Sequence, residues 1–336
     1  MSRPLVDFAP AASPLLRDPP LDHVTELPVL GIATRFATNS RYVRELVEET
    51  FGGWRCVADD ADASPGAQVR IVVHEGDEGD EGEEHGAGHA PVRHICPDAT
   101  RVIAHSPGSV AISDPARAEA VAYVTTALAA DRAHFRDAML EAITLALLSH
   151  FDRHPVHAAA VARDGHAVLL AGPSGSGKST LACLAHAAGF HVLGDDRVWV
   201  QLAPRRRVWG WPGRARLLPD AAAHLPELAR LGAPDETDGK GKLAVTLGGA
   251  PGAARYVAER ATVCLLVRAQ GRAGLQRLAP AEVADVLARR PDPGFDRFPG
   301  RHEAVVRTLA AHGGWRLALS DDPREALPLL QRMLDD

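Results

Sequence analysis

The stretch AVLLAGPSGSGKSTLACLAHAAGFHVLGDDRVWV, residues 167–200, decides the fold of this 336-residue chain. It begins with five apolar residues, which is typical of a buried strand, and continues through a loop rich in glycine and serine. An alanine- and leucine-rich segment typical of a helix follows, and a second apolar run then ends at two aspartates. A strand, a loop, a helix and a further strand in this order predict an α/β fold in which helices cover a sheet.

Residues 172–180 contain the pattern G-x-x-x-x-G-K-[ST]. Glycines let successive backbone N–H groups converge on phosphate oxygens at the positive end of the following helix. The lysine of this pattern reaches the β- and γ-phosphates, and the hydroxyl after it ligates Mg²⁺. We therefore expect ATP and Mg²⁺ as cofactors. The expected nucleotide site comprises Gly172, Pro173, Ser174, Gly175, Ser176, Gly177, Lys178, Ser179 and Thr180.

Asp195 and Asp196 end the second apolar run, only 17 residues after Lys178. A carboxylate beside a metal-bound nucleotide can hold the metal or accept the proton of an attacking hydroxyl, and two adjacent carboxylates can divide these roles. A capped turn with solvated aspartates is the alternative, but the neighbouring phosphate loop favours a chemical role. We expect Ser179, Asp195 and Asp196 to be the metal ligands.

From His157 to Val198 the chain resembles the catalytic core of HPr kinase/phosphorylase, the HPr serine kinase C-terminal domain. His157, the phosphate loop, Gly189 and the sequence DDRV that starts at Asp195 match that family without a gap. The resemblance implies an ATP-dependent kinase that phosphorylates a serine hydroxyl. It also implies that Asp196 is the base, that Asp195 is its metal-binding or hydrogen-bonding neighbour, that His157 orients the pair and that Lys178 is catalytic. A buried strand histidine bonded to the backbone is the alternative for His157.

The chain also departs from the family. Thr180 stands where the enzymes that act on HPr usually carry a glutamate, and their Gly-rich signature segment with its Arg-Glu motif is missing after Asp196. Because that segment is tied to phosphorolysis and to HPr recognition, another substrate is favoured. The chain is more similar to divergent relatives such as the peptide-tailoring kinases.

The expected reaction is transfer of the γ-phosphoryl group of ATP to a hydroxyl, preferably a Ser or Thr of a peptide or small protein. A kinase for a small-molecule alcohol or a free amino acid is the second hypothesis. The third is a nucleotide-binding regulatory module with little transfer activity. Since members of the family often assemble, the resemblance also implies a possible homo-oligomer.

Two arginines and two lysines are candidate substrate residues. Arg214 and Arg216 follow two tryptophans in WGWPGRAR, residues 209–216, and their guanidinium groups suit a phosphate or a carboxylate. Packing of the tryptophans in the core is an equally weighted alternative. Lys240 and Lys242 are the only lysines besides Lys178 in a chain with 34 arginines. They lie in a glycine-rich loop that could close over the site, although a solvated loop is the more common case.

The bulk composition excludes several classes of protein. The chain has a net charge of −6. Seven of its acidic residues lie within residues 74–89, and without them the remaining chain carries a net charge of +1. This balance predicts neither a nucleic-acid partner nor a membrane surface. No apolar run is long enough for a transmembrane helix, no secretion signal is recognised, and the four cysteines are far apart. We expect free thiols and a cytoplasmic location.

We expect a Pro-rich tail over residues 1–25, a mixed α+β region over 26–150 with an acidic loop at 74–89, and the HPr kinase-like ATP-binding domain over 151–336. In the α+β region we predict a strand at 26–34, a helix at 41–54 capped by Asn39-Ser40, a small antiparallel sheet, and helices at 116–131 and 133–151. In the catalytic domain we predict a hairpin turning at Asp164-Gly165 and a helix at 179–188 ending at Gly189. Further helices are predicted at 219–230, 280–288, 302–312 and 323–334, and further strands at 190–194, 198–202, 208–211, 243–247, 262–267 and 315–320.

Overall fold

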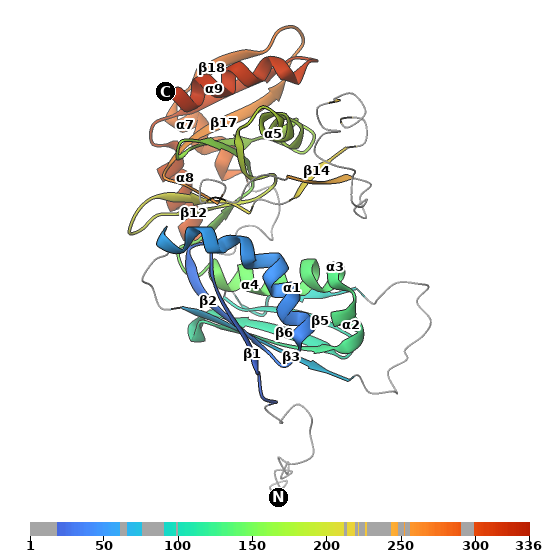
Figure 1. Ribbon diagram of the computed structural model, residues 1–336. Helices are drawn as coiled ribbons and strands as arrows, with labels where there is room; N and C mark the ends of the chain where they lie inside the picture. The colour runs from blue at the N-terminus through green and yellow to red at the C-terminus, as the bar shows by residue number, and fades with distance from the viewer. Residues whose placement is uncertain are drawn as a thin grey trace, which may run out of the picture.

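One mixed sheet with its helices occupies the N-terminal half of the chain, and a second group of sheets and helices occupies the C-terminal half (Figure 1). The structure is a computed structural model that describes residues 19–60, 66–75, 91–98, 100–211, 214–218, 221, 226, 243–247, 252, 256–289 and 299–336. The α/β class expected from the sequence is confirmed. None of the helices in these ranges has the length and apolar character needed to cross a membrane.

The N-terminal half is built on a seven-stranded sheet in the order β1-β2-β3-β7-β6-β5-β4. Its strands are β1 (His23–Val29), β2 (Ile32–Thr38), β3 (Ala67–His74), β4 (Arg93–Ile95), β5 (Val102–Ser106), β6 (Ser109–Asp114) and β7 (Glu119–Thr125). The expected antiparallel sheet is only partly correct, because β3 pairs in parallel with both β2 and β7. The helix between β2 and β3 returns the chain to the same end of the sheet, and this connection makes the two strands parallel.

The helix expected over residues 116–131 is wrong. This segment forms β7 followed by the short helix α2 (Thr126–Ala130). Ala120, Ala122 and Val124 alternate with less buried residues and face the core, which is the period of a strand. Because alanine is a good helix former, the many alanines of this segment led to the prediction of a helix. In the strand, the small alanine side chains fit beneath the helices that cover the sheet.

The single strand expected over residues 26–34 is also wrong, since these residues form the hairpin of β1 and β2. Leu30 and Gly31 make the turn with φ of 52° and 72°, and the Gly31 N–H donates to the Pro28 carbonyl at 2.9 Å. A turn with two positive φ values suits adjacent strands, but it usually carries Asn-Gly or Asp-Gly. Because leucine occupies the first position of this turn, the sequence did not predict the turn.

The helices of this half agree better with the expectation. Helix α1 (Arg41–Phe51) is capped by the Ser40 hydroxyl, which accepts from the Val43 N–H, and it buries the predicted face. It ends three residues early, and a 3₁₀ segment continues over Gly52–Asp60. The helix expected over residues 133–151 is present as three consecutive pieces: α3 (Arg132–Phe135), a π-helical turn (Arg136–Leu140) and α4 (Glu141–Leu148).

A six-stranded sheet in the order β11-β9-β10-β17-β19-β18 carries the C-terminal half. Its strands are β9 (Ala159–Arg163), β10 (His166–Ala171), β11 (His191–Gly194), β17 (Arg260–Arg268), β18 (Gly274–Leu278) and β19 (Gly314–Leu319). Strands β10, β17 and β19 are parallel, so their carboxyl ends lie at one edge of the sheet. The hairpin of β9 and β10 turns at Asp164-Gly165, as predicted, with φ of 49° and 72°.

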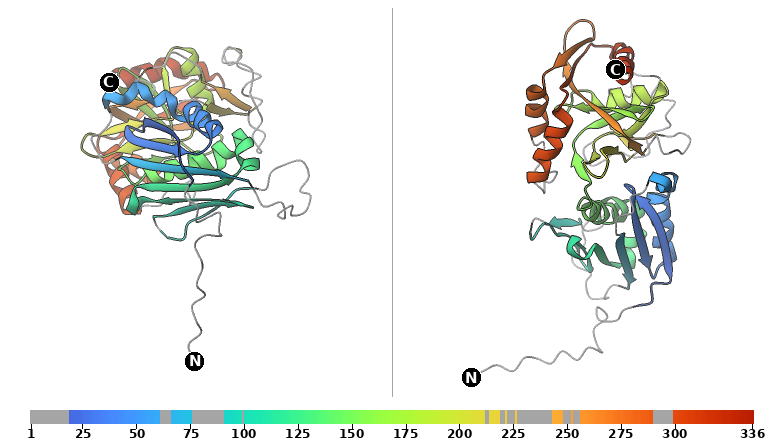
Figure 2. Two further views of the ribbon diagram at one scale, coloured as in Figure 1. Left: turned by 60° about the horizontal axis from the view of Figure 1, so that its bottom comes forward. Right: turned by 90° about the vertical axis from the view of Figure 1, so that its left-hand side faces the viewer.

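Helices cover both faces of this sheet (Figure 2). Val168 and Leu170 of β10 point into the core beneath α5 (Lys178–Ala187) and α9 (Leu327–Asp335). The alternate residues Ala167, Leu169 and Ala171 point toward the opposite face, where α7 (Pro280–Ala288) and α8 (Pro299–Ala310) pack. β10 is buried along its whole length, which fixes the position of the loop that follows it.

Two small sheets complete the described fold. One contains β8 (His154–Val156), β12 (Val198–Gln201), β13 (Arg207–Trp209) and β16 (Val257–Ala258), and the other contains β14 (Arg214–Leu217) and β15 (Leu243–Thr246). The strands β14, β16 and β18 were not predicted. The tail at 1–18, most of the acidic loop, the helix predicted at 219–230 and the loop at 235–242 lie outside the described residues, apart from Ala221 and Pro226.

The two halves meet through a layer of aromatic rings. The Trp54 ring of the N-terminal half lies 4.6 Å from the Tyr256 ring and 5.8 Å from the Trp211 ring, measured between centroids. Trp209 is fully buried in the same core, and the Arg153 Nε donates to the Leu30 carbonyl at 2.7 Å. The tryptophans of residues 209–211 are therefore packing residues, which confirms the structural alternative for these side chains.

Candidate functional site

The glycine-rich loop lies at the carboxyl edge of the six-stranded sheet, between β10 and α5. Gly177 directly precedes α5 with φ of 98°, and a Cβ there would lie 2.9 Å from the Leu319 Cδ1. A Cβ on Gly172 would lie 2.8 Å from the Ser176 hydroxyl oxygen. Only glycine fits both positions, so the backbone forms a concave loop at the positive end of a helix, which suits phosphate.

Lys178 folds back over this loop. Its ammonium group donates to the carbonyls of Gly172 at 2.8 Å and Pro173 at 3.1 Å, and the residue is only 8% exposed. The loop therefore holds a positive charge against its own concave backbone. The sequence-predicted loop is thus one structural unit in which the lysine contacts the first two residues.

The two aspartates follow β11 but have different surroundings. Asp195 is 6% exposed, and its Oδ2 accepts from the Arg216 backbone N–H at 2.9 Å. The Asp196 side chain is 60% exposed, and its Oδ1 lies 3.3 Å from the His157 Nδ1. The structure thus brings His157 and Asp196 together and fixes Asp195 from the backbone of β14.

The electrostatics link these residues to the loop. Burial lowers the pKa of His157, the charge of Asp196 opposes this, and the charge of Lys178 lowers the pKa further. The net effect is a lowered pKa, so the imidazole is uncharged at neutral pH and can orient Asp196 without neutralising it. Burial also raises the pKa of the Cys183 thiol on α5, and the charge of Asp195 adds to this.

The candidate substrate residues have mixed positions. Arg214 and Arg216 lie on β14, and the Arg216 side chain is exposed. The contact that Arg216 makes with the site is through its backbone N–H, which the sequence did not predict. The Arg214 side chain, Lys240 and Lys242 lie outside what the structure describes, so their roles stay predictions.

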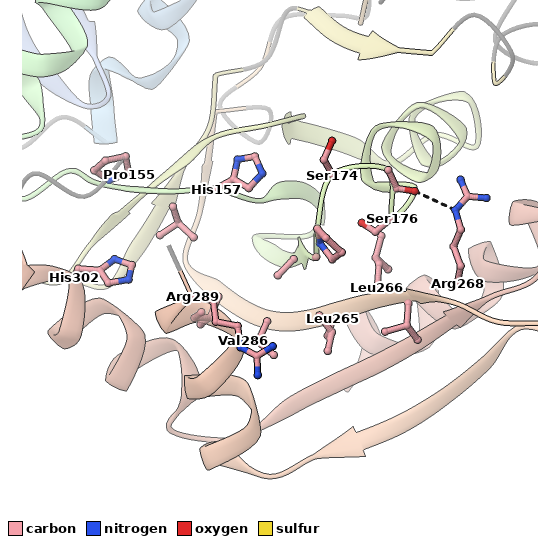
Figure 3. A pocket seen from close by; sticks show the side chains of 17 residues that line it. Pro155, His157, Ser174, Ser176, Leu265, Leu266, Arg268, Val286, Arg289 and His302 are labelled. Carbon is pink, nitrogen blue, oxygen red and sulfur yellow. Dashed lines mark hydrogen bonds between the residues drawn. The ribbon is translucent and has the colours of Figure 1, made fainter. Parts of the chain in front are cut away.

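A cavity of about 660 Å³ adjoins the phosphate loop (Figure 3). Its walls are the first half of the loop, residues 155–157 at the end of β8, the end of β17, the end of α7, and His302 of α8. Arg268 closes one side, where its Nε donates to the Gly175 carbonyl at 3.1 Å. The sequence reasoning missed Arg268 and His302. Arg268 directly follows a predicted strand, and the carboxyl end of a strand parallel to β10 was the signal that could have found it.

The donor set near the loop suits magnesium. Ser179, in the first turn of α5, and the aspartates offer hard oxygen ligands, which Mg²⁺ takes together with phosphate oxygens and water. Within the described ranges no cluster of three or more His, Cys, Asp or Glu side chains forms a metal site on its own. A metal here would therefore depend on the nucleotide for part of its coordination.

Comparisons with known proteins do not assign the chain to a family. No family model matches it, and no curated protein matches it. The resemblance to HPr kinase therefore depends on the residues between His157 and Val198 and on the site that they form.

Proposed function

We propose that this protein is an ATP-dependent kinase, similar to HPr kinase, that transfers the γ-phosphoryl group to a hydroxyl of a peptide or small protein. One observation carries the proposal. An exposed carboxylate, Asp196, lies 3.3 Å from a histidine that is within the electrostatic reach of the phosphate-loop lysine. Phosphoryl transfer needs a base, a group that orients the base and a phosphate site close together.

The phosphate loop would bind the nucleotide. Its backbone N–H groups and Lys178 would hold the β- and γ-phosphates, and the Ser179 hydroxyl with Asp195 or Asp196 would hold Mg²⁺. Magnesium supplies neutralisation of the charge on the transferring group. Because Lys178 already lies over the loop carbonyls, binding would exchange these two contacts for phosphate oxygens.

Asp196 would act as the base. Its exposed carboxylate would accept the proton of the acceptor hydroxyl while that oxygen attacks the γ-phosphorus and the bond to ADP breaks. His157 would act as a positioning residue, because its uncharged ring would hold Asp196 at one oxygen and leave the other oxygen for the acceptor. Asp195 is more buried and fixed by a backbone N–H, which suits a ligand or a support rather than a base.

The test measures binding and transfer separately. Asp196→Asn should lower the rate of phosphate transfer to a Ser- and Thr-containing peptide library by about 10²- to 10⁴-fold. It should leave binding of N-methylanthraniloyl-ATP nearly unchanged, whereas Lys178→Ala should weaken both. Asp164→Asn, in the hairpin turn at the other end of β10, is the matched control and should change neither.

Three outcomes separate the hypotheses. An unchanged transfer rate in Asp196→Asn would show that this residue is not the base. Phosphorylation of free alcohols or amino acids, but of no peptide, would favour the small-molecule kinase. Nucleotide binding without transfer to any acceptor of either class would favour the regulatory module.

A further inference from the structure

The cavity beside the phosphate loop has mainly apolar walls (Figure 3). Val156, Leu265, Val267, Val286 and Leu287 supply side chains from three different elements. The polar groups of the lining are few and lie around these apolar walls. A concave apolar site of about 660 Å³ is within the usual size range of pockets that bind small ligands or side chains.

One wall of this cavity adjoins the proposed base. His157 lines the cavity and also lies 3.3 Å from Asp196. The first half of the phosphate loop, residues 172–176, forms a second wall. A group bound in the cavity would therefore lie between the phosphate loop and the residue that positions the base, which is where an acceptor must approach.

His302 adds a polar group to the apolar lining. Its Nε2 is buried, and no hydrogen-bond partner for it occurs among the described residues. The ring comes from α8 and lies on the same side of the cavity as Pro155 (Figure 3). A buried ring nitrogen without a partner is unfavourable, but this atom has almost no accessible surface, so the ring contributes to the wall of the cavity rather than to a contact with its occupant.

From these observations we propose that the cavity binds a large aliphatic or aromatic side chain next to the hydroxyl that is phosphorylated. This inference rests on the proposed kinase function and specifies its substrate class. A bare serine would leave the apolar walls in contact with water, whereas burial of a leucine or phenylalanine would raise transition-state affinity. The expected preference in kcat/KM is about 10- to 100-fold.

The experiment uses peptides with one fixed serine and varied neighbours, with ATP and Mg²⁺. The wild type should prefer Leu, Ile, Phe or Tyr over Gly and Asp at one position adjacent to the serine. Val286→Trp, which fills the cavity, should reduce that preference to about twofold or less and leave N-methylanthraniloyl-ATP binding unchanged. If Val286→Trp does not fold, Leu287→Phe replaces it in the experiment as a substitution that fills less of the cavity. Ala281→Trp, an exposed position at the other end of α7, is the control and should keep the preference.

The possible failures are distinguishable. If the wild type phosphorylates peptides without any preference for a large apolar neighbour, the kinase proposal stands and this inference is wrong. If the filling variants lose nucleotide binding while Ala281→Trp keeps it, the cavity holds the nucleobase and the inference is also wrong. If the wild type transfers phosphate to no peptide, the proposed function fails, and the inference fails with it.

Discussion

Asp195 and Asp196 show how adjacent residues can have different surroundings. Both lie in the bend that directly follows β11. Asp195 is buried and accepts from the Arg216 N–H, whereas the Asp196 side chain is exposed and lies beside His157. The sequence showed that the two aspartates are adjacent, whereas their different surroundings follow from the position of β14 in the fold.

Stability measurements should separate these aspartates. Asp195→Ala removes a buried carboxylate that accepts from a partly buried backbone N–H, so the free energy of unfolding should fall by about 1–3 kcal/mol. Asp196→Ala alters an exposed side chain and should change it by only about 0.5 kcal/mol. Urea unfolding followed by circular dichroism measures both. Equal losses would show that Asp195 is not the supporting residue.

Lys178 is a lysine in a chain that otherwise uses arginine almost everywhere, and its surroundings give a reason. The ammonium is a compact charge that fits between the carbonyls of Gly172 and Pro173, while a guanidinium is planar and larger. Lys178→Arg keeps the charge but should weaken N-methylanthraniloyl-ATP binding by about tenfold or more. Fluorescence titration checks this, and affinity within twofold of the wild type would contradict it.

Among the helices, strands and turns, the features that the sequence predicted correctly are those that local interactions determine. The phosphate loop, the Asp164-Gly165 turn and the Ser40 cap each depend on residues a few positions apart, and each lies where expected. β7 was missed because its alanines are typical of a helix, and the turn at Leu30 was missed because leucine rarely adopts positive φ. The cavity was missed because β17, α7 and α8 meet the loop only in the folded chain.

Helix α9 docks on the six-stranded sheet through His166. One ring nitrogen lies 3.0 Å from the Leu334 carbonyl and the other lies 2.8 Å from the Thr262 hydroxyl. A neutral imidazole satisfies both, by donating to the carbonyl and accepting from the hydroxyl. Burial lowers the pKa of His166; the Leu334 carbonyl opposes this and the charge of Arg260 lowers the pKa further. The folded state therefore prefers the uncharged ring.

This preference predicts a pH-dependent stability. Because the pKa of His166 is lower in the folded chain, the unfolded chain binds the proton more readily below about pH 6.5. The contribution of His166 is complete above that pH and is lost as the pH falls through the lowered pKa. Urea unfolding from pH 7.5 to 5 should show a smaller loss in His166→Gln than in the wild type. Parallel profiles would show that His166 does not titrate with folding.

At the scale of the molecule, the aspartates lie at a connection between sheets. The chain leaves β11 of the six-stranded sheet, passes Asp195 and Asp196, and enters β12 of the four-stranded sheet. Trp199 and Trp209 of that sheet pack in the core of the N-terminal half. The sheet that follows the aspartates is thus packed against the N-terminal half.

Two hairpin glycines test this packing. Gly31 and Gly165 both have φ of 72°, so replacing either by alanine adds about 1 kcal/mol of backbone strain. A Cβ on Gly165 would meet open space, whereas a Cβ on Gly31 would overlap the Trp209 indole ring of the other half. Gly31→Ala should therefore lower the free energy of unfolding by about 1–3 kcal/mol more than Gly165→Ala does. It should also slow phosphate transfer, because a displaced β13 shifts β12 and Asp196. Calorimetry and the peptide assay measure these effects, and equal losses in both variants would show that the two halves fold and function independently.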